Sequence, residues 1–244
     1  MKMYKSKKDK KESLKDFFNN KIYFGPFTGL KVPDALYKIL TVSEILGMYE
    51  SCLHPLFSQL FNRKIKNIVL VGGNNGYYSA GLNYLYNPEK IVIYEMVQEL
   101  HSTISSWFET NNLSNYEILG EATVDGFKNW KEKTDLLLID CEGFEVQLLN
   151  PIEFEWQKKT DVIVELHPFY VDRLLNIIAE RFSETHEIEI IYDDFSEDDK
   201  IDKILKGLNL NIDYSHHPNH RWIKENGKKI FTSGLFMFLK RKTL

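Results

Sequence analysis

The segment NIVLVGGNNGYYSAGLNYLY (residues 67–86) decides the fold. Residues 67–71 form an apolar run of strand length, residues 72–76 form a glycine-rich loop, and residues 77–86 follow with helical spacing. A buried strand that turns through glycines directly into a helix is typical of an α/β sheet with a nucleotide-like ligand. Gly72 and Gly76 should therefore lie at the carboxyl end of the first strand, where such sheets bind their ligands.

The rest of the chain continues this alternation of strands and helices. Further strand-length runs occur at residues 90–95, 115–119, 134–140, 160–167, 186–194 and 234–242, and stretches of helical period separate most of them. Continuous apolar strands between amphipathic helices predict an α/β protein with a mostly parallel sheet covered on both faces. A polar insertion, residues 195–233, separates the last two strands without an obvious packing helix, and we expect the final strand to be antiparallel.

The segment before the first strand predicts a helical cover. Residues 1–66 contain amphipathic stretches such as SEILGMYESCLHPLFSQLF, which should pack on the sheet and partly cover the cofactor cleft. We divide the chain into a lysine-rich tail with an N-terminal helical extension (residues 1–45) and a catalytic domain (residues 46–244). The tail carries seven lysines in its first fifteen residues and is interpreted as a solvated, partly disordered segment; a patch for an anionic partner is the alternative.

Composition excludes several classes of protein. The 244 residues fit one α/β domain with extensions, and a net charge of -4 gives the domain no electrostatic footprint for nucleic acid. The sequence has neither an apolar run long enough to span a membrane nor an apolar core after the N-terminal lysines. Cys52 and Cys141 are too few for a disulfide framework, so we expect buried thiols in a soluble, cytoplasmic protein.

The spacing of the glycine loop disfavours a dinucleotide. A dinucleotide fold requires G-x-G-x-x-G, whereas this loop reads G-G-N-N-G, with Gly72 and Gly76 four residues apart. That spacing suits a cofactor without pyrophosphate, such as S-adenosylmethionine, which presents a ribose diol, an adenine and a sulfonium cation. Glu95 ends the second strand, where its carboxylate can accept both ribose hydroxyls; NAD enzymes share this feature, and a solvated strand-end charge is the alternative. Glu121 and Ala122, after the third strand, could contact the adenine edge or belong to an ordinary loop.

Acidic residues also follow the fourth and fifth predicted strands. Asp140 and Glu142 come directly after one strand, and Glu165 and His167 end the next. These side chains could approach one another and deprotonate a substrate hydroxyl, or bind a divalent metal. In the alternative interpretation, Asp140 and Glu142 only cap the following helix, and His167 is a structural hydrogen-bond donor.

These motifs together resemble the FkbM type of class I S-adenosylmethionine-dependent methyltransferases. The matching segments are VGGNNGYYS (71–79), YE (94–95), IDCEGFE (139–145), ELH (165–167) and, upstream, LGMYES (46–51). The resemblance covers roughly residues 45–193. It implies a Rossmann-like seven-stranded fold, S-adenosyl-L-methionine as the cofactor and, most often in this family, O-methylation.

The predicted site follows from the motifs and the resemblance together. The cofactor-binding residues are Gly72, Gly73, Asn74, Gly76, Tyr77, Glu95, Met96, Glu121, Ala122 and Asp140, and the catalytic candidates are Asp140, Glu142 and His167, with no resident metal assigned. One position departs from the family, because Leu70 replaces an acid that usually helps to hold the amino-acid end of the cofactor. Asp140 and the loop backbone, with help from Asn74 and Asn75, could supply that contact; weakened cofactor affinity is the alternative.

The acceptor is expected over the carboxyl ends of the fourth and fifth strands, beneath the N-terminal helices and the insertion. HHPNHRW (216–222) could hold a sugar or another small polar acceptor, or it could be a surface loop anchored by Trp222, and its histidines lack a convincing partner set for zinc. Two rival functions stay open. They are an NAD(P)-dependent oxidoreductase, disfavoured by the loop spacing, and a non-catalytic relative, favoured by Leu70.

Overall fold

The computed structural model describes residues 14–193, 196–210, 212, 221–225, 228–232 and 234–242. Its centre is a seven-stranded sheet of order β3-β2-β1-β4-β5-β9-β6. The strands are β1 (Asn67–Val71), β2 (Lys90–Tyr94), β3 (Tyr116–Leu119), β4 (Leu136–Ile139), β5 (Asp161–Glu165), β6 (His186–Tyr192) and β9 (Leu235–Arg241). β1 to β5 pair in parallel, and β9 is antiparallel to both β5 and β6. The predicted Rossmann-like sheet with an antiparallel last strand is confirmed.

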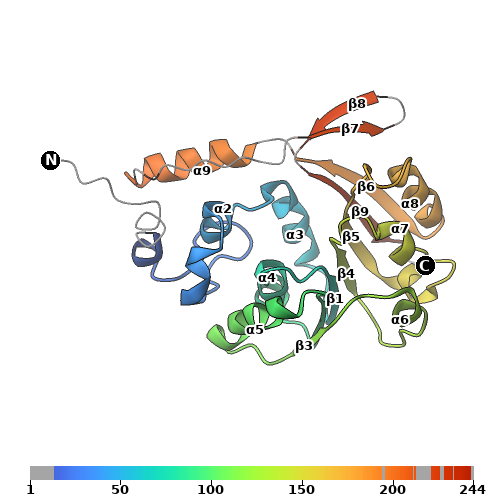
Figure 1. The fold of residues 1–244 in the computed structure, drawn as a ribbon, viewed down its shortest axis with the longest axis horizontal. Coiled ribbons are helices and arrows are strands. Elements are labelled where there is room, and N and C mark those ends of the chain that lie inside the picture. Colours follow the sequence, from blue (N-terminus) through green and yellow to red (C-terminus); the bar gives the residue numbers. More distant parts are fainter. Residues whose placement is uncertain are drawn as a thin grey trace.

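Helices cover both faces of this sheet (Figure 1). One face carries α4 (Tyr77–Tyr86) and α5 (His101–Thr110), and the other carries α6 (Val124–Lys128), α7 (Glu145–Leu148) and α8 (Leu174–Phe182). Successive side chains of a strand point to opposite faces, and β1 shows the consequence. Ile68 and Leu70 lie in one hydrophobic core, while Val69 and Val71 lie in the other. The strand is therefore apolar throughout, as a doubly covered strand must be.

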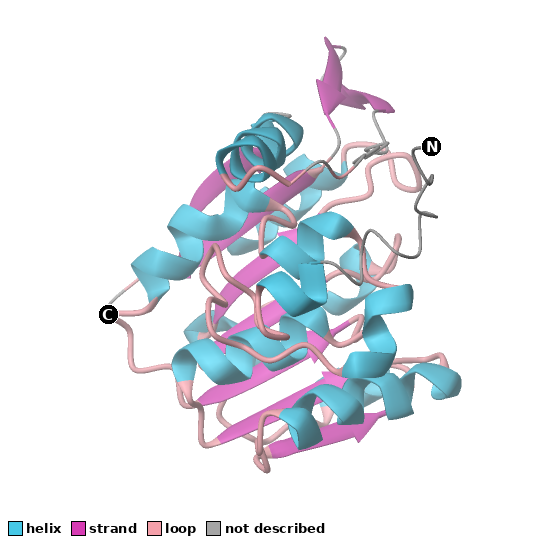
Figure 2. Ribbon diagram, turned by 90° about the vertical axis from the view of Figure 1, so that its left-hand side faces the viewer, coloured by secondary structure: helices cyan, strands magenta, loops and turns pink. Residues whose placement is uncertain are grey.

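The segment before β1 forms a second layer over the α4–α5 face. This side of the molecule faces the viewer in Figure 2. The segment contains η1 (Asp34–Lys38), α2 (Val42–Leu46), η2 (Ser51–Leu53) and α3 (His54–Leu60). Helix α2 begins with a capping box, in which Thr41 and Glu44 satisfy each other's backbone N–H groups. Leu14 and Phe18 belong to the same hydrophobic core as Leu70, so the described part of the extension packs on this face of the sheet, as predicted. None of its residues lines the larger of the two cavities described below, so the predicted cover over the cofactor cleft is not seen there.

The insertion before the last strand differs from its prediction. It contains a twelve-residue helix, α9 (Ser196–Gly207), and a hairpin of β7 (Arg221–Glu225) and β8 (Lys228–Thr232). The expectation of no packing helix was wrong, because α9 is highly charged and its short apolar stripe is easily overlooked. Ile201 and Leu205 are buried on that stripe, and α9 packs beside α2 on the N-terminal layer.

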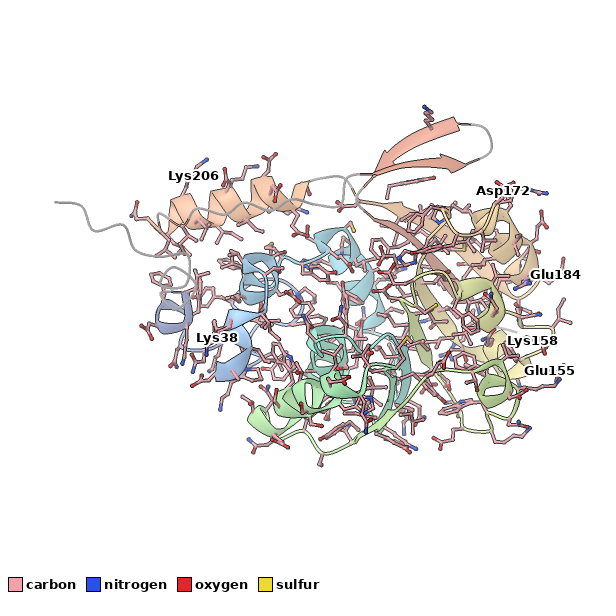
Figure 3. The ribbon with its side chains drawn as sticks, in the orientation of Figure 1. Lys38, Glu155, Lys158, Asp172, Glu184 and Lys206 are labelled. Atoms are coloured by element: carbon pink, nitrogen blue, oxygen red, sulfur yellow. The ribbon has the colours of Figure 1, made fainter. Side chains whose placement is uncertain are left out.

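Charged side chains mark the outer surface of the molecule. Glu155, Asp172, Glu184 and Lys206 lie at the periphery of the ribbon (Figure 3), and Lys38 is exposed on the N-terminal layer. In the described part of the chain, no helix is long and apolar enough to cross a membrane. The first thirteen residues, most of the predicted lysine-rich tail, lie outside the described residues.

Candidate active site

The register of the sheet brings the predicted loops to one edge. Val71 at the end of β1 pairs with Tyr94 of β2 on one side and with Ile139 of β4 on the other. The next residues along the three strands, Gly72, Glu95 and Asp140, therefore emerge level with one another. Since β1 and β4 are sequence-distant neighbours at the point where strand order reverses, this edge is where an open α/β sheet binds its ligand.

The glycine loop has a backbone that only particular residues can adopt. Gly72 has φ +90°, and a Cβ there would lie 1.9 Å from the carbonyl oxygen of Asp140. Gly76 has φ +89° and packs against Trp107, whose Nε1 donates to the carbonyl of Asn75 at 2.9 Å. Asn74 also has a positive φ, of 43°, which asparagine tolerates better than most residues. The two glycines and the asparagine thus allow β1 and β4 to approach closely and turn the loop over the strand ends.

A cavity of about 320 Å³ lies beside this loop. Seven of the ten predicted cofactor-binding residues line it: Gly72, Asn74, Glu95, Met96, Glu121, Ala122 and Asp140. Apolar side chains complete much of its wall, including Val97, Leu100 and Phe144. Glu142 lines the cavity too, so four carboxylates face it, and no lysine or arginine of the described residues lines it.

The Glu95 carboxylate is fixed by backbone groups on both of its oxygens. Asn74 N donates to Oε2 and Val97 N donates to Oε1, each at 2.7 Å. The side chain is buried, with 6% of its surface exposed. Each carboxylate oxygen can accept more than one hydrogen bond. Glu95 is therefore held in one orientation and keeps acceptor capacity for hydroxyl groups of a ligand.

Three residues of the predicted cofactor set do not line the cavity. A Cβ on Gly73 would meet Ile93 and Ile104 in the core, and Gly76 packs on Trp107. The Tyr77 ring is buried among aromatic side chains of the N-terminal layer. We therefore interpret all three as residues that shape the loop.

Leu70, the departure from the family pattern, is fully buried in the core. It belongs to the core on the α4–α5 face and does not line the cavity. An acid at this position would have to be held by partners from the N-terminal layer, because an unpaired buried charge is strongly unfavourable.

His167 lies at the centre of a cluster of carboxylates. The side chain is buried, and its Nδ1 lies 2.5 Å from Oε1 of the fully buried Glu145. Its Nε2 lies 3.4 Å from Glu142, 3.8 Å from Glu165 and 3.9 Å from Asp140. The structure thus brings together all four residues that the sequence placed at the ends of these two strands, and it adds Glu145.

Asp140 and Glu142 do not cap helix α7. This helix begins at Glu145, and its N-cap residue, Phe144, makes no side-chain capping bond. Glu142 has φ +51°, and Gly143 follows with φ +110°. A non-glycine residue held in this region is uncommon and is more frequent at functional sites. The left-handed turn directs Glu142 back over the strand ends, which the helix-capping interpretation does not explain.

Glu50 of the N-terminal layer faces the same edge of the sheet, and the sequence interpretation did not assign it a role. A smaller cavity lies between the N-terminal layer and the sheet and is lined by Glu50, Tyr78, Asp140 and Glu165, among others. Tyr78 donates its hydroxyl to Glu50 at 2.5 Å. Burial raises the pKa of Glu50 to about 8; Asp140 and Glu197 raise it as well, against the opposing hydrogen bonds from Tyr78 and Tyr49. The sequence signal that could have identified Glu50 was its position in LGMYES (46–51), the upstream segment that resembles the family.

The N-terminal layer holds the glycine loop as well as covering it. Glu44 accepts a hydrogen bond from the Asn75 side chain at 2.5 Å, and Asn75 Oδ1 accepts one from Tyr77 N at 3.0 Å. Helix α9 holds this layer in turn, because Glu197 accepts from Ser43 Oγ at 2.5 Å and from Glu50 N at 2.9 Å. Hydrogen bonds of the adjacent residues Ser43 and Glu44 therefore connect α9 on one side with the glycine loop on the other.

The two cysteines are not joined by a disulfide. Cys141 lines the larger cavity. Burial raises the pKa of its thiol, and the neighbouring Glu145 raises it further, so the thiol is protonated at neutral pH. Of the predicted acceptor loop, the segment with His216, His217 and His220 lies outside the described residues, whereas Arg221 and Trp222 are the first two residues of β7.

Comparison with known proteins shows similarity in structure only. No protein-family model and no curated protein matches the sequence. The structure is similar to an O-methyltransferase from Bacillus cereus in complex with SAH, at 14% identity, with 98% of this chain and 93% of that chain covered and a TM-score of 0.46. It is similar to an O-methyltransferase from Streptomyces achromogenes involved in tomaymycin synthesis, in complex with SAM, at 14% identity, 98% and 91% coverage and a TM-score of 0.48.

A spermidine synthase from Thermotoga maritima is also similar, at 11% identity, with 77% of this chain and 57% of that chain covered and a TM-score of 0.46. At such low identities and TM-scores, these likenesses say nothing about the reaction of this chain.

Proposed function

We propose that this chain is an S-adenosylmethionine-dependent methyltransferase of the FkbM type that methylates a hydroxyl on a sugar or another small polar acceptor. The observation that carries the proposal is the lining of the 320 Å³ cavity, in which Glu95, Glu121, Asp140 and Glu142 are the only charged residues among those described. A sulfonium cation suits such a wall, because opposite charges attract across it.

The same lining argues against a dinucleotide cofactor. A pyrophosphate needs backbone N–H groups or basic side chains, and here it would face carboxylates. The N–H of Asn74 in the glycine loop already donates to Glu95. A hydride-transfer enzyme that uses NAD(P) is therefore the weaker proposal, although it shares the general architecture.

The parts of the cofactor can be assigned to parts of the cavity. Glu95, fixed through both oxygens, would accept the two ribose hydroxyls. Met96, Val97 and Phe144 line the cavity and would supply apolar surface for the adenine, and Glu121 and Ala122 would contact its edge. Because Leu70 offers no acid, we assign the amino-acid end to Asp140 and the loop backbone, with Glu50 as a second carboxyl close to Asp140.

The catalytic assignment separates two roles. A methyl group on a sulfonium is already activated, so the protein mainly has to align donor and acceptor. Asp140 and Glu142 line the cavity and can take the proton of an acceptor hydroxyl. His167 is buried behind them, so we propose it as a positioning residue for these carboxylates. Residues 46–244 would form the catalytic domain, with residues 1–45 as its extension.

Calorimetry with S-adenosylhomocysteine tests the cofactor assignment. We expect saturable binding to the full chain, and at least tenfold weaker binding to Glu95→Gln, because a hydrogen bond to a charged group contributes about 1.5–3 kcal/mol. Glu99→Gln is the matched control, since Glu99 is exposed on a neighbouring turn and does not line the cavity. The absence of binding at high micromolar concentration, or binding of NAD instead, contradicts the proposal.

Methyl transfer needs its own experiment. Incubation of the protein with radiolabelled S-adenosylmethionine and a cell extract should label a small polar component, and Asp140→Asn should lose that labelling. Cofactor binding without transfer to any component would favour a non-catalytic relative of the methyltransferases.

A further inference from the structure

We propose that Asp140, Glu165 and His167 form a binding site for one divalent cation, such as Mn²⁺. One ligand atom from each residue lies within 4.8 Å of the other two. The three residues come from the adjacent ends of β4 and β5, where Ile139 pairs with Val164. The site is thus built on two neighbouring strands of the sheet, which are rigid supports for a metal site.

The bonding of His167 gives an independent reason to expect a cation. Nδ1 of His167 is paired with the Glu145 carboxyl group, a contact that favours the tautomer carrying its hydrogen on Nδ1. A neutral imidazole then presents a lone pair at Nε2. That lone pair would face the carboxylate oxygens of Glu142, Glu165 and Asp140. Asp140, Glu142 and Glu165 thus place three carboxylates around this one nitrogen, an arrangement that a bound cation would stabilise.

The distances favour the metal ion over the proton. Nε2 lies 3.8 Å from Glu165 Oε1 and 3.9 Å from Asp140 Oδ1, and the nearest carboxylate oxygen, Glu142 Oε2, is at 3.4 Å. All three distances exceed the usual range of about 2.7–3.2 Å for an N–H···O hydrogen bond. Two ligands of one ion with bonds of about 2.0–2.2 Å lie roughly 3–4.3 Å apart, depending on the angle at the metal. The two separations from Nε2 fall within this interval.

The contact between Glu145 and His167 is the outer partner that metal-binding histidines usually have. Ligating histidines donate their second ring N–H to a carboxylate or carbonyl, which fixes the ring and raises its basicity. Glu145 is fully buried, and its Oε1 also accepts from Gly143 N at 3.1 Å. A buried carboxylate held by the backbone and directed at the rear of an imidazole is thus a positioning residue for His167.

The ligand chemistry selects the class of ion. Two carboxylates and one imidazole suit Mn²⁺, Fe²⁺ or Zn²⁺ better than Ca²⁺, which prefers oxygen ligands alone, or Cu⁺, which prefers sulfur. Three protein ligands leave coordination positions for water or for an acceptor oxygen. Asp140 is also assigned to the amino-acid end of the cofactor, so binding of the ion is measured on cofactor-free protein, where it does not depend on the methyltransferase proposal.

Paramagnetic resonance with Mn²⁺ alone tests this site directly. After treatment with a chelator, the full chain should bind one Mn²⁺ with a single nitrogen coupling from an imidazole. Competition with Mg²⁺ and with Zn²⁺ then ranks the ions. Absence of saturable binding up to about 1 mM, the weak end for protein carboxylate sites, overturns the proposal, as does binding without a nitrogen coupling. An Nε2 proton observed by nitrogen NMR, with no bound metal, overturns it as well.

Variants identify the ligands. Asp140→Asn, Glu165→Gln and His167→Gln should each weaken Mn²⁺ binding by at least tenfold, and Glu145→Gln should weaken it by about 10–100-fold while the nitrogen coupling changes. Glu184→Gln is the control and should leave binding unchanged, because Glu184 lies at the periphery, far from the strand ends (Figure 3). Equal binding in all variants contradicts the assignment. Calorimetry with S-adenosylhomocysteine on metal-free protein keeps this result separate from that of the cofactor proposal.

Discussion

Replacing Glu50 with glutamine should make the protein more stable at pH 8 than the unmodified chain, with little effect at pH 5. The folded state raises the pKa of this carboxyl from 4.5 to about 8, chiefly through burial. A glutamine resembles the protonated acid in shape and can still accept the hydrogen bond from Tyr78. Its uncharged amide avoids the unfavourable burial of a carboxylate near Asp140 and Glu197.

The magnitude follows from proton linkage. Between pH 4.5 and about 8, the folded chain holds a proton on Glu50 that the unfolded chain has released. The free energy of unfolding therefore falls as pH rises through this window, by up to about 1.4 kcal/mol per pH unit. This contribution is fully present below pH 4.5 and is lost above about pH 8. Allowing for the partial exposure of Glu50, we expect a loss of about 2–3 kcal/mol between pH 5 and pH 8.

Urea unfolding in the presence of a chelator measures this effect. The difference between Glu50→Gln and the unmodified chain should grow from near zero at pH 5 to about 2–3 kcal/mol at pH 8, with equal m values. Glu184→Gln should follow the unmodified chain at every pH, because Glu184 is exposed. Parallel stability curves for Glu50→Gln and the unmodified chain would falsify the argument that Glu50 is buried as a neutral acid.

Two further substitutions test the loop and the insertion. Gly72→Ala should reduce stability by about 2–5 kcal/mol and abolish S-adenosylhomocysteine binding, because its Cβ would collide with the Asp140 carbonyl at a strained φ; Gly120→Ala, where a Cβ meets nothing within 4 Å, is the calorimetric control. Ile201→Ala should cost about 2–5 kcal/mol in urea unfolding, since Ile201 anchors α9 in the core. The exposed Lys203→Ala on the same helix should change stability by less than about 0.5 kcal/mol, and equal losses in both variants would mean that α9 does not depend on this packing.

The strands were predictable because their residues are apolar on both faces. The run at 67–71 became β1, and the run at 160–167 contains β5. The helix after β4 was predicted at 143–149 but spans only Glu145–Leu148, because Glu142 and Gly143 adopt left-handed conformations first. Helix α9 was missed because most of its residues are charged, although Ile201 and Leu205 follow helical spacing. Its packing beside α2 depends on residues far away in the chain.

The sequence by itself determined that Gly72, Glu95, Asp140 and Glu165 would lie at one edge of the sheet. That placement needs only parallel strands, whose carboxyl ends share an edge, so it follows from the order of strands and polar residues along the chain. Chain order also identified His167 as a member of this group.

Only the tertiary structure decided how these residues are used. It turned the Tyr77 ring into the core, buried Glu145 behind His167, and placed Glu50 from the N-terminal layer beside Asp140. Each of these outcomes depends on packing between segments far apart in the chain, where burial and neighbouring charges set the orientation and protonation of a side chain. The local sequence does not indicate these neighbours, so the orientation and protonation of the three side chains could be assigned only from the tertiary structure.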